Sequence, residues 1–162
     1  VGEERRRVRL SGSFRILESH VVQDCGKSLN PLLDVGQAEG GFLFGVGYYM
    51  LEELIHAPDG SLITNNVSGY KLPSCGDVPL VWDIELLNHD PKGTGLHNSK
   101  GIGESNTQLG LSVYFAAKEA VRAARVAAGM SPEFSLGFPA STIKVSESLP
   151  PLAEILRGPV SV

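Results

Sequence analysis

Residues 36–55 read GQAEGGFLFGVGYYMLEELI and carry most of the information about the fold. Apolar side chains surround most of a helical projection of this segment, so we expect a helix that is buried over most of its circumference. Each glycine in it would cost about 1 kcal/mol relative to alanine in a helix. The spacing of these glycines places several near one face, where a neighbouring backbone or a ligand can approach closely. The segment therefore predicts a buried helix with a close neighbour.

Shorter elements are expected on both sides of this helix. The predicted elements are, in chain order, a strand at 14–22, the helix at 36–55, strands at 61–64 and 80–87, a glycine-rich loop at 88–103 and an amphipathic helix at 107–128. Gly129 and Pro132 are expected to end the last helix. This order predicts an α+β fold rather than the regular strand–helix alternation of a doubly wound sheet.

The composition favours a soluble globular domain, with 162 residues, 42% hydrophobic and 20% charged. A net charge of −4 argues against nucleic acid or an anionic membrane as the main partner. No apolar stretch reaches the roughly 20 residues that a membrane span needs. No metal-ligand spacing links Cys25, Cys75 or the histidines His20, His56, His89 and His97. We expect two reduced thiols, a cytoplasmic location and no metal held by protein side chains.

The junction between the predicted loop and the last helix is the first candidate site. Residues 99–105 read SKGIGES, and its two glycines allow the backbone to turn tightly and approach a ligand. Glu104 lies just before a helix amino terminus, where N–H groups and the helix dipole stabilise a carboxylate. If the loop lines a pocket, Glu104 could act as a general base. By position alone it could equally be a helix cap.

The second candidate site is residues 36–40, GQAEG, at the predicted start of the apolar helix. An amide next to glycines at a helix amino terminus can bind an anion such as phosphate. Alternatively, Gln37 and Glu39 could simply satisfy the free N–H groups of the helix. Neither glycine cluster completes a dinucleotide fingerprint or a P-loop.

Several motifs, taken in order, resemble the molybdenum hydroxylase family of aldehyde oxidases and xanthine dehydrogenases. Residues 24–31, DCGKSLNP, are similar to its D-x-G-x-S-L-N-P, and residues 34–42, DVGQAEGGF, to its D-[IV]-G-Q-x-E-G-[AG]-F. The remaining matches are LEEL at 51–54, PDGSL at 58–62, YKLP at 70–73, SKGIGES at 99–105 and AVRAAR at 120–125. Ser105 stands where xanthine dehydrogenases usually carry proline, which favours aldehyde oxidase.

The resemblance implies a site and a cofactor. Glu104 would be the general base beside a molybdenum–molybdopterin cofactor, while Gln37, Ile102 and Gly103 would contact that cofactor. The substrate would be an aldehyde, a purine or an N-heterocycle, with water as the oxygen source. Electrons would leave through iron–sulfur clusters to FAD, and the full protein would be a homodimer.

The resemblance also implies a division of the chain. Residues 11–142 would be the carboxy-terminal part of a molybdopterin-binding domain, residues 1–10 a divergent end, and residues 143–162 a proline-rich, loosely held tail. The cluster and flavin domains and the first half of the molybdenum domain have no counterpart here, so we expect a fragment that is inactive alone. It would work with the remainder of its polypeptide or with partner subunits. Two alternatives are a non-catalytic remnant acting as a structural or interaction module, and part of the large subunit of a bacterial multi-subunit enzyme.

Overall fold

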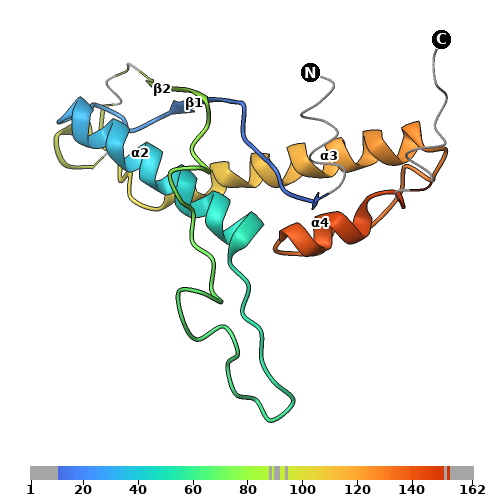
Figure 1. The fold of residues 1–162 in the computed structure, drawn as a ribbon. Coiled ribbons are helices and arrows are strands. Elements are labelled where there is room, and N and C mark those ends of the chain that lie inside the picture. The colour runs from blue at the N-terminus through green and yellow to red at the C-terminus, as the bar shows by residue number, and fades with distance from the viewer. Residues whose placement is uncertain (1–10, 88, 90–91, 94, 152, 154–162) are drawn as a thin grey trace. The chain divides into compact units, whose positions relative to one another are not determined.

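A computed structural model of the chain describes residues 11–87, 89, 92–93, 95–151 and 153. Figure 1 shows the chain coloured along its sequence. The chain forms two compact units. Unit 1 comprises Val1–Phe14, Tyr48–Leu72 and Ser112–Val162, and unit 2 comprises Arg15–Gly47 and Pro73–Leu111. The predicted divergent end, residues 1–10, lies outside the described residues. Across the described part of the chain, no helix is both long and apolar enough to cross a membrane.

Unit 2 contains a pair of parallel strands. β1 (Glu18–Gln23) and β2 (Val81–Leu86) pair in register from Glu18 opposite Val81 to Gln23 opposite Leu86. Both strands were predicted, at 14–22 and 80–87. Exposure alternates along each strand, which is the pattern of a sheet covered on one face. Together with the helices, this pair confirms the predicted α+β class.

The helix α2 (Pro31–Val46) begins before the predicted start at residue 36. Asn30 caps it by accepting a hydrogen bond from the Leu33 N–H at 3.4 Å, and proline occupies the first turn, where its missing N–H costs nothing. A π-helical turn, η1 (Gly47–Leu51), follows it, so the helical stretch ends before the predicted residue 55.

The prediction that this helix is buried over most of its circumference is wrong in extent. Ala38, Phe42 and Val46 are buried on one face, whereas Phe44 and Tyr48 are 63% and 51% exposed. The physical reason is that apolar content reports what a helix could bury, not how many neighbours cover it.

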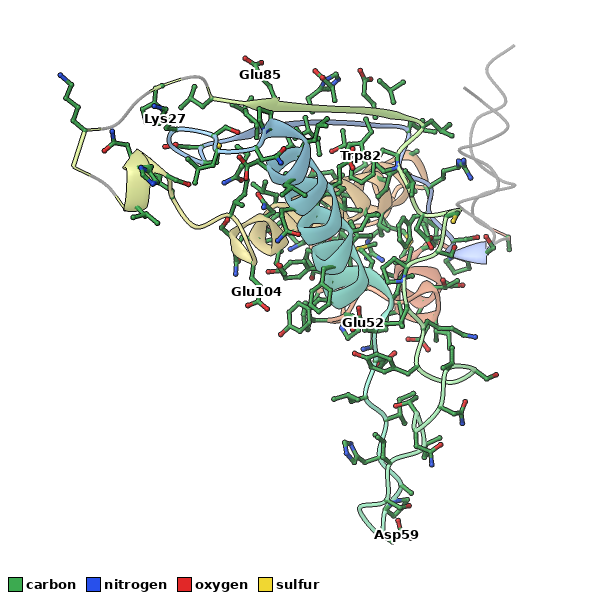
Figure 2. The ribbon with its side chains drawn as sticks, turned by 90° about the vertical axis from the view of Figure 1, so that its left-hand side faces the viewer. Lys27, Glu52, Asp59, Trp82, Glu85 and Glu104 are labelled. Atoms are coloured by element: carbon green, nitrogen blue, oxygen red, sulfur yellow. The ribbon has the colours of Figure 1, made fainter. Side chains whose placement is uncertain are left out.

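The buried face of α2 packs on β2 and on a second helical segment. The rings of Phe42 and Trp82 lie 6.0 Å apart between centroids, and Figure 2 shows Trp82 between the strand and the helix. The 3₁₀ helix η3 (Ser105–Gly110) crosses α2 so closely that a Cβ built on Gly45 would lie 2.1 Å from the Thr107 carbonyl oxygen. A Cβ on Gly110 would lie 2.5 Å from the carbonyl carbon of Gly45. The predicted close approach of another backbone to the glycine face is thus confirmed.

Unit 1 contains α4 (Thr142–Ser148) and all of α3 (Leu111–Ala127) except Leu111. Its buried apolar residues include Val121, Leu136 and Val145. Arg125 ties α3 to the end of α4 by donating from Nη1 to the Ser148 carbonyl at 3.1 Å. The helix predicted over 107–128 is therefore divided between η3 and α3, and Gly129 with φ +74° ends it as expected.

One strand prediction for unit 1 is wrong. The strand predicted at 61–64 is only an isolated bridge between His56 and Leu62, because this segment folds back locally on residues 55–57. Residues 143–148, the first part of the predicted tail, belong to α4, and Val145 and Leu149 are buried. The division of the chain at residue 143 stays a prediction.

Candidate active site

Glu104 is at the N-cap position of η3, as its place in the sequence predicted. The Glu104 carbonyl accepts a hydrogen bond from the Thr107 N–H at 3.0 Å, but its side chain makes no capping hydrogen bond. The carboxylate is exposed and projects away from the neighbouring ribbons (Figure 2). It therefore does not serve as the cap that its position allows.

The loop in front of Glu104 is held against α2 by Asn106. Asn106 is fully buried and donates from Nδ2 to the Ile102 carbonyl at 3.0 Å, which closes the turn over residues 102–106. Its Oδ1 atom is buried with no hydrogen-bond partner within the described part of the chain. A Cβ built on Gly41 of α2 would lie 2.7 Å from Asn106 Cβ and 3.4 Å from the Gly103 carbonyl oxygen. Only a glycine on α2 lets this turn come so near.

Gln37 lies on the same helix, one turn before Gly41. Residues four apart share a helix face, so the face that carries Gln37 continues into the contact with Gly103. The Gln37 side chain is exposed, as is that of Glu39. The structure thus brings the loop bearing Ile102, Gly103 and Glu104 next to the helix bearing Gln37, all within unit 2.

The glycines around these residues fall into two sets. The enclosed glycines are Gly41, Gly45 and Gly110, where a Cβ would meet the backbone or side chain of another segment. The open glycines are Gly36, Gly40, Gly101 and Gly103, where a Cβ would find no heavy atom within 4 Å among the described residues. None of the open glycines has a φ in the left-handed region. Neither packing nor backbone conformation within the described structure accounts for them.

The loop is also tied to the turn that follows β1. Lys100 Nζ pairs with Asp24 Oδ2, and the Lys100 N–H donates to the Cys25 carbonyl at 2.9 Å. The hydrogen bond from Lys100, supported by one from the Gly26 N–H, lowers the pKa of Asp24 below its usual value. Cys25 is buried, and burial raises the pKa of its thiol, which keeps it neutral and unreactive.

Known proteins resemble this chain throughout most of its length. Residues 8–79 match a family described as the molybdopterin cofactor-binding domain. A xanthine dehydrogenase of Dictyostelium discoideum is 41% identical over 139 residues, which are 86% of this chain and 10% of that protein. The chain belongs to the aldehyde oxidase and xanthine dehydrogenase family. It spans about a tenth of the length of the curated relatives it matches.

Relatives of both enzyme kinds are similar to this member of the family. Aldehyde oxidase 2 of Cavia porcellus is 45% identical over 129 residues, 78% of this chain and 10% of that protein. The fold also matches a solved structure, quinoline 2-oxidoreductase of Pseudomonas putida 86. That match has a TM-score of 0.68 and 26% identity, and it covers 92% of this chain and 17% of the other. The α+β arrangement is therefore that of a molybdenum-cofactor domain.

The residues present fit a cofactor that brings its own metal. Within the described residues, no three His, Cys, Asp or Glu side chains gather as a protein-held metal would require. The exposed Gln37 amide can both donate and accept hydrogen bonds. The open glycines on both sides leave room for a bulky group to approach the backbone. These are groups suited to an organic cofactor, not to direct metal ligation.

Three side chains that hold this loop carry no sign of that role in the local sequence. Asp24 and Lys100 stand inside quoted motifs, but their pairing across 76 positions leaves no local sign. Asn106 has no motif at all, and only its burial in the folded chain reveals it.

Proposed function

We propose that this chain supplies part of a molybdenum hydroxylase active site, with Glu104 as the general base. The main support for this assignment is the position of the Glu104 carboxylate. It is exposed at a helix start, makes no capping hydrogen bond, and follows a glycine loop that lies against the helix bearing Gln37. A carboxylate not used by the fold, beside open backbone, is available to take a proton from a bound reactant.

The other residues have supporting roles in this proposal. Gln37 would hydrogen-bond the molybdopterin, and the backbone at Ile102 and Gly103 would lie along it. The cofactor, when bound, would supply the two-electron oxidation of the substrate carbon. Glu104 would accept the proton released as an oxygen atom from water joins that carbon.

The whole protein is also part of the proposal. Its substrates would be aldehydes, purines or N-heterocycles, and iron–sulfur clusters and FAD, carried elsewhere in the protein or on partner subunits, would take the electrons. We further propose a cytoplasmic homodimer, with the two unpaired cysteines in accord with that compartment. Serine at position 105 favours an aldehyde oxidase. Because relatives of both kinds match this chain, that assignment needs a direct test with substrates.

The test is the E104Q variant of the complete protein that contains this chain, purified with its cofactor. Turnover of benzaldehyde, xanthine and quinoline would be measured together with molybdenum content. Removing a general base should lower kcat by about 10²- to 10⁴-fold while molybdenum content stays unchanged. E85Q is the matched control, because Glu85 is an exposed glutamate on β2 of the same unit (Figure 2) and should leave kcat unaltered.

Each outcome has a clear meaning. Turnover by E104Q near that of the unmodified protein would contradict the assignment of the base. A cofactor-loaded protein that turns over none of the three substrates would favour the non-catalytic remnant instead. Preference for benzaldehyde over xanthine would support the aldehyde oxidase reading of Ser105.

A further inference from the structure

The turn after β1 is fastened to the loop that leads to Glu104. Gly26 and Ser99 form an isolated antiparallel bridge. The Lys27 N–H donates to the Asn98 carbonyl at 3.0 Å, and the Lys100 N–H donates to the Cys25 carbonyl at 2.9 Å. Gly26 has a φ of +66°, and a Cβ there would lie 2.5 Å from the Asn98 carbonyl oxygen. The turn therefore needs its glycine, and it fixes the backbone at residues 98–100.

Asp24 organises this turn from both sides. Its Oδ1 accepts the Gly26 N–H at 2.9 Å, and its Oδ2 pairs with Lys100 Nζ. His89 Nδ1 lies 3.6 Å from Oδ1, so the charged groups that face this carboxylate are Lys100 and, when protonated, His89. The two side chains of the pair are 38% and 36% exposed. A partly exposed ion pair of this kind adds little to overall stability, so its main effect is on local geometry.

The segment preceding Glu104 contains two residues in the left-handed region and two open glycines. His97 and Asn98 have φ values of +54° and +63°, a region that residues other than glycine seldom adopt. A Cβ built on Gly101 or Gly103 would have no heavy atom within 4 Å in the described structure. Such a loop keeps one conformation only if its surroundings fix it. Asn106 does so after Ile102, and the Asp24 turn does so before Gly101.

The same turn also leads into the helix that carries Gln37. Ser28 Oγ donates to Asp34 Oδ2 at 2.6 Å, and Asn30 caps α2. One short segment, residues 24–34, thus connects to both halves of the candidate site. We propose that Asp24 and Lys100 are positioning residues whose pair fixes the orientation of the Glu104 loop relative to Gln37. This inference rests on the proposed function of Glu104.

The decisive variant is K100M in the complete, cofactor-loaded protein, with K100R as the conservative partner. Methionine keeps the length of the side chain but loses the ion pair with Asp24. We expect kcat for benzaldehyde or xanthine to fall by about 10- to 100-fold, because a small misplacement of a reacting group has that effect. KM and molybdenum content should stay within a few-fold, and K100R should recover most of kcat.

Hydrogen–deuterium exchange gives a second readout on the same variants. Peptides that cover residues 98–104 should exchange faster in K100M than in the unmodified protein, while peptides from α3 should not change. R122M is the matched control, since Arg122 forms an exposed ion pair with Glu119 at 3.3 Å, and both belong to unit 1 whereas this loop belongs to unit 2. It should alter neither kcat nor exchange at 98–104.

Failure of this inference is distinguishable from failure of the proposed function. An inactive E104Q with a K100M of normal kcat would overturn the positioning role and leave the base intact. An active E104Q would overturn the base first. Loss of molybdenum from K100M, or a K100R as impaired as K100M, would also overturn the positioning role, because the pair would then be structural or specific to lysine.

Discussion

Gly45 and Gly40 lie five positions apart on the same helix, in opposite surroundings. Gly45 is enclosed: the backbone of η3 comes so near that a single added carbon would overlap it. Gly40 is open: no described residue occupies the space beside it. The same division separates Gly110 from Gly103 on the crossing segment.

The difference indicates two distinct physical roles for glycine in this helix. An enclosed glycine is explained by the fold itself, since it lets two backbones cross. An open glycine in a helix weakens it by about 0.5–1 kcal/mol relative to alanine, with no gain from contacts within the described chain. The open glycines lie beside Gln37 and Glu104 in the sequence. We infer that their benefit comes from a bound group.

The largest effect is expected where the enclosed set is broken. Gly45→Ala would place Cβ 2.1 Å from the Thr107 carbonyl oxygen, a backbone atom that cannot rotate away. The crossing of α2 and η3 would have to separate, at a cost of about 3 kcal/mol, the upper end for an overpacked core. Thermal denaturation of the complete protein, followed with its yield of folded material, measures this. An unchanged midpoint would show that the crossing is looser than described.

Gly40→Ala on the open face is the matched comparison and should act in the opposite direction. With nothing within 4 Å in the described structure, the methyl group fits, and helix propensity should raise stability by about 0.5–1 kcal/mol.

The larger Gly40→Leu should also fold, but on the proposed function it would occupy space that the cofactor needs. We expect its molybdenum content, measured by elemental analysis, to fall while its thermal midpoint holds. Full molybdenum occupancy in Gly40→Leu would remove the open face from the proposed site.

The same distinction shows what the sequence could predict. Local patterns located α2, both strands of unit 2 and the helix start at Glu104, because periodicity and capping are properties of neighbouring residues. The predicted start of α2 at residue 36 was too late, although the local sequence marks the true start. Asn30 is an N-cap residue, and Pro31 is a proline in the first turn. The glycine density correctly predicted a close neighbour, but it could not tell enclosed from open positions.

What remained out of reach depends on contacts between distant residues. Asp24 and Lys100 are 76 positions apart, and nothing near either one announces the other. The exposure of Phe44 and Tyr48 is likewise not written in their own segment, because burial depends on what folds over them. The roles of Gln37, Ile102, Gly103 and Glu104 stay predictions that rest on motif resemblance and now on their placement in unit 2.

The smallest effect is expected at the turn of Gly26, where a Cβ would lie 2.5 Å from the Asn98 carbonyl oxygen and where an ion pair adds to the backbone bonds. The lowered pKa of Asp24 means that its carboxylate strengthens the folded turn at any pH above the usual aspartate value of about 3.9. That contribution should be lost as pH falls through the lower folded pKa, when Asp24 takes up a proton. Exchange at residues 98–100, corrected for the intrinsic effect of pH, should be slower in the unmodified protein than in K100M at pH 6. The two should converge once the pH has fallen below the lowered folded pKa of Asp24. D24N lacks the titrating group, so its difference from K100M should not vary with pH. A gap between the unmodified protein and K100M that persists when Asp24 is protonated would mean that the turn is held by its backbone bonds and not by the ion pair.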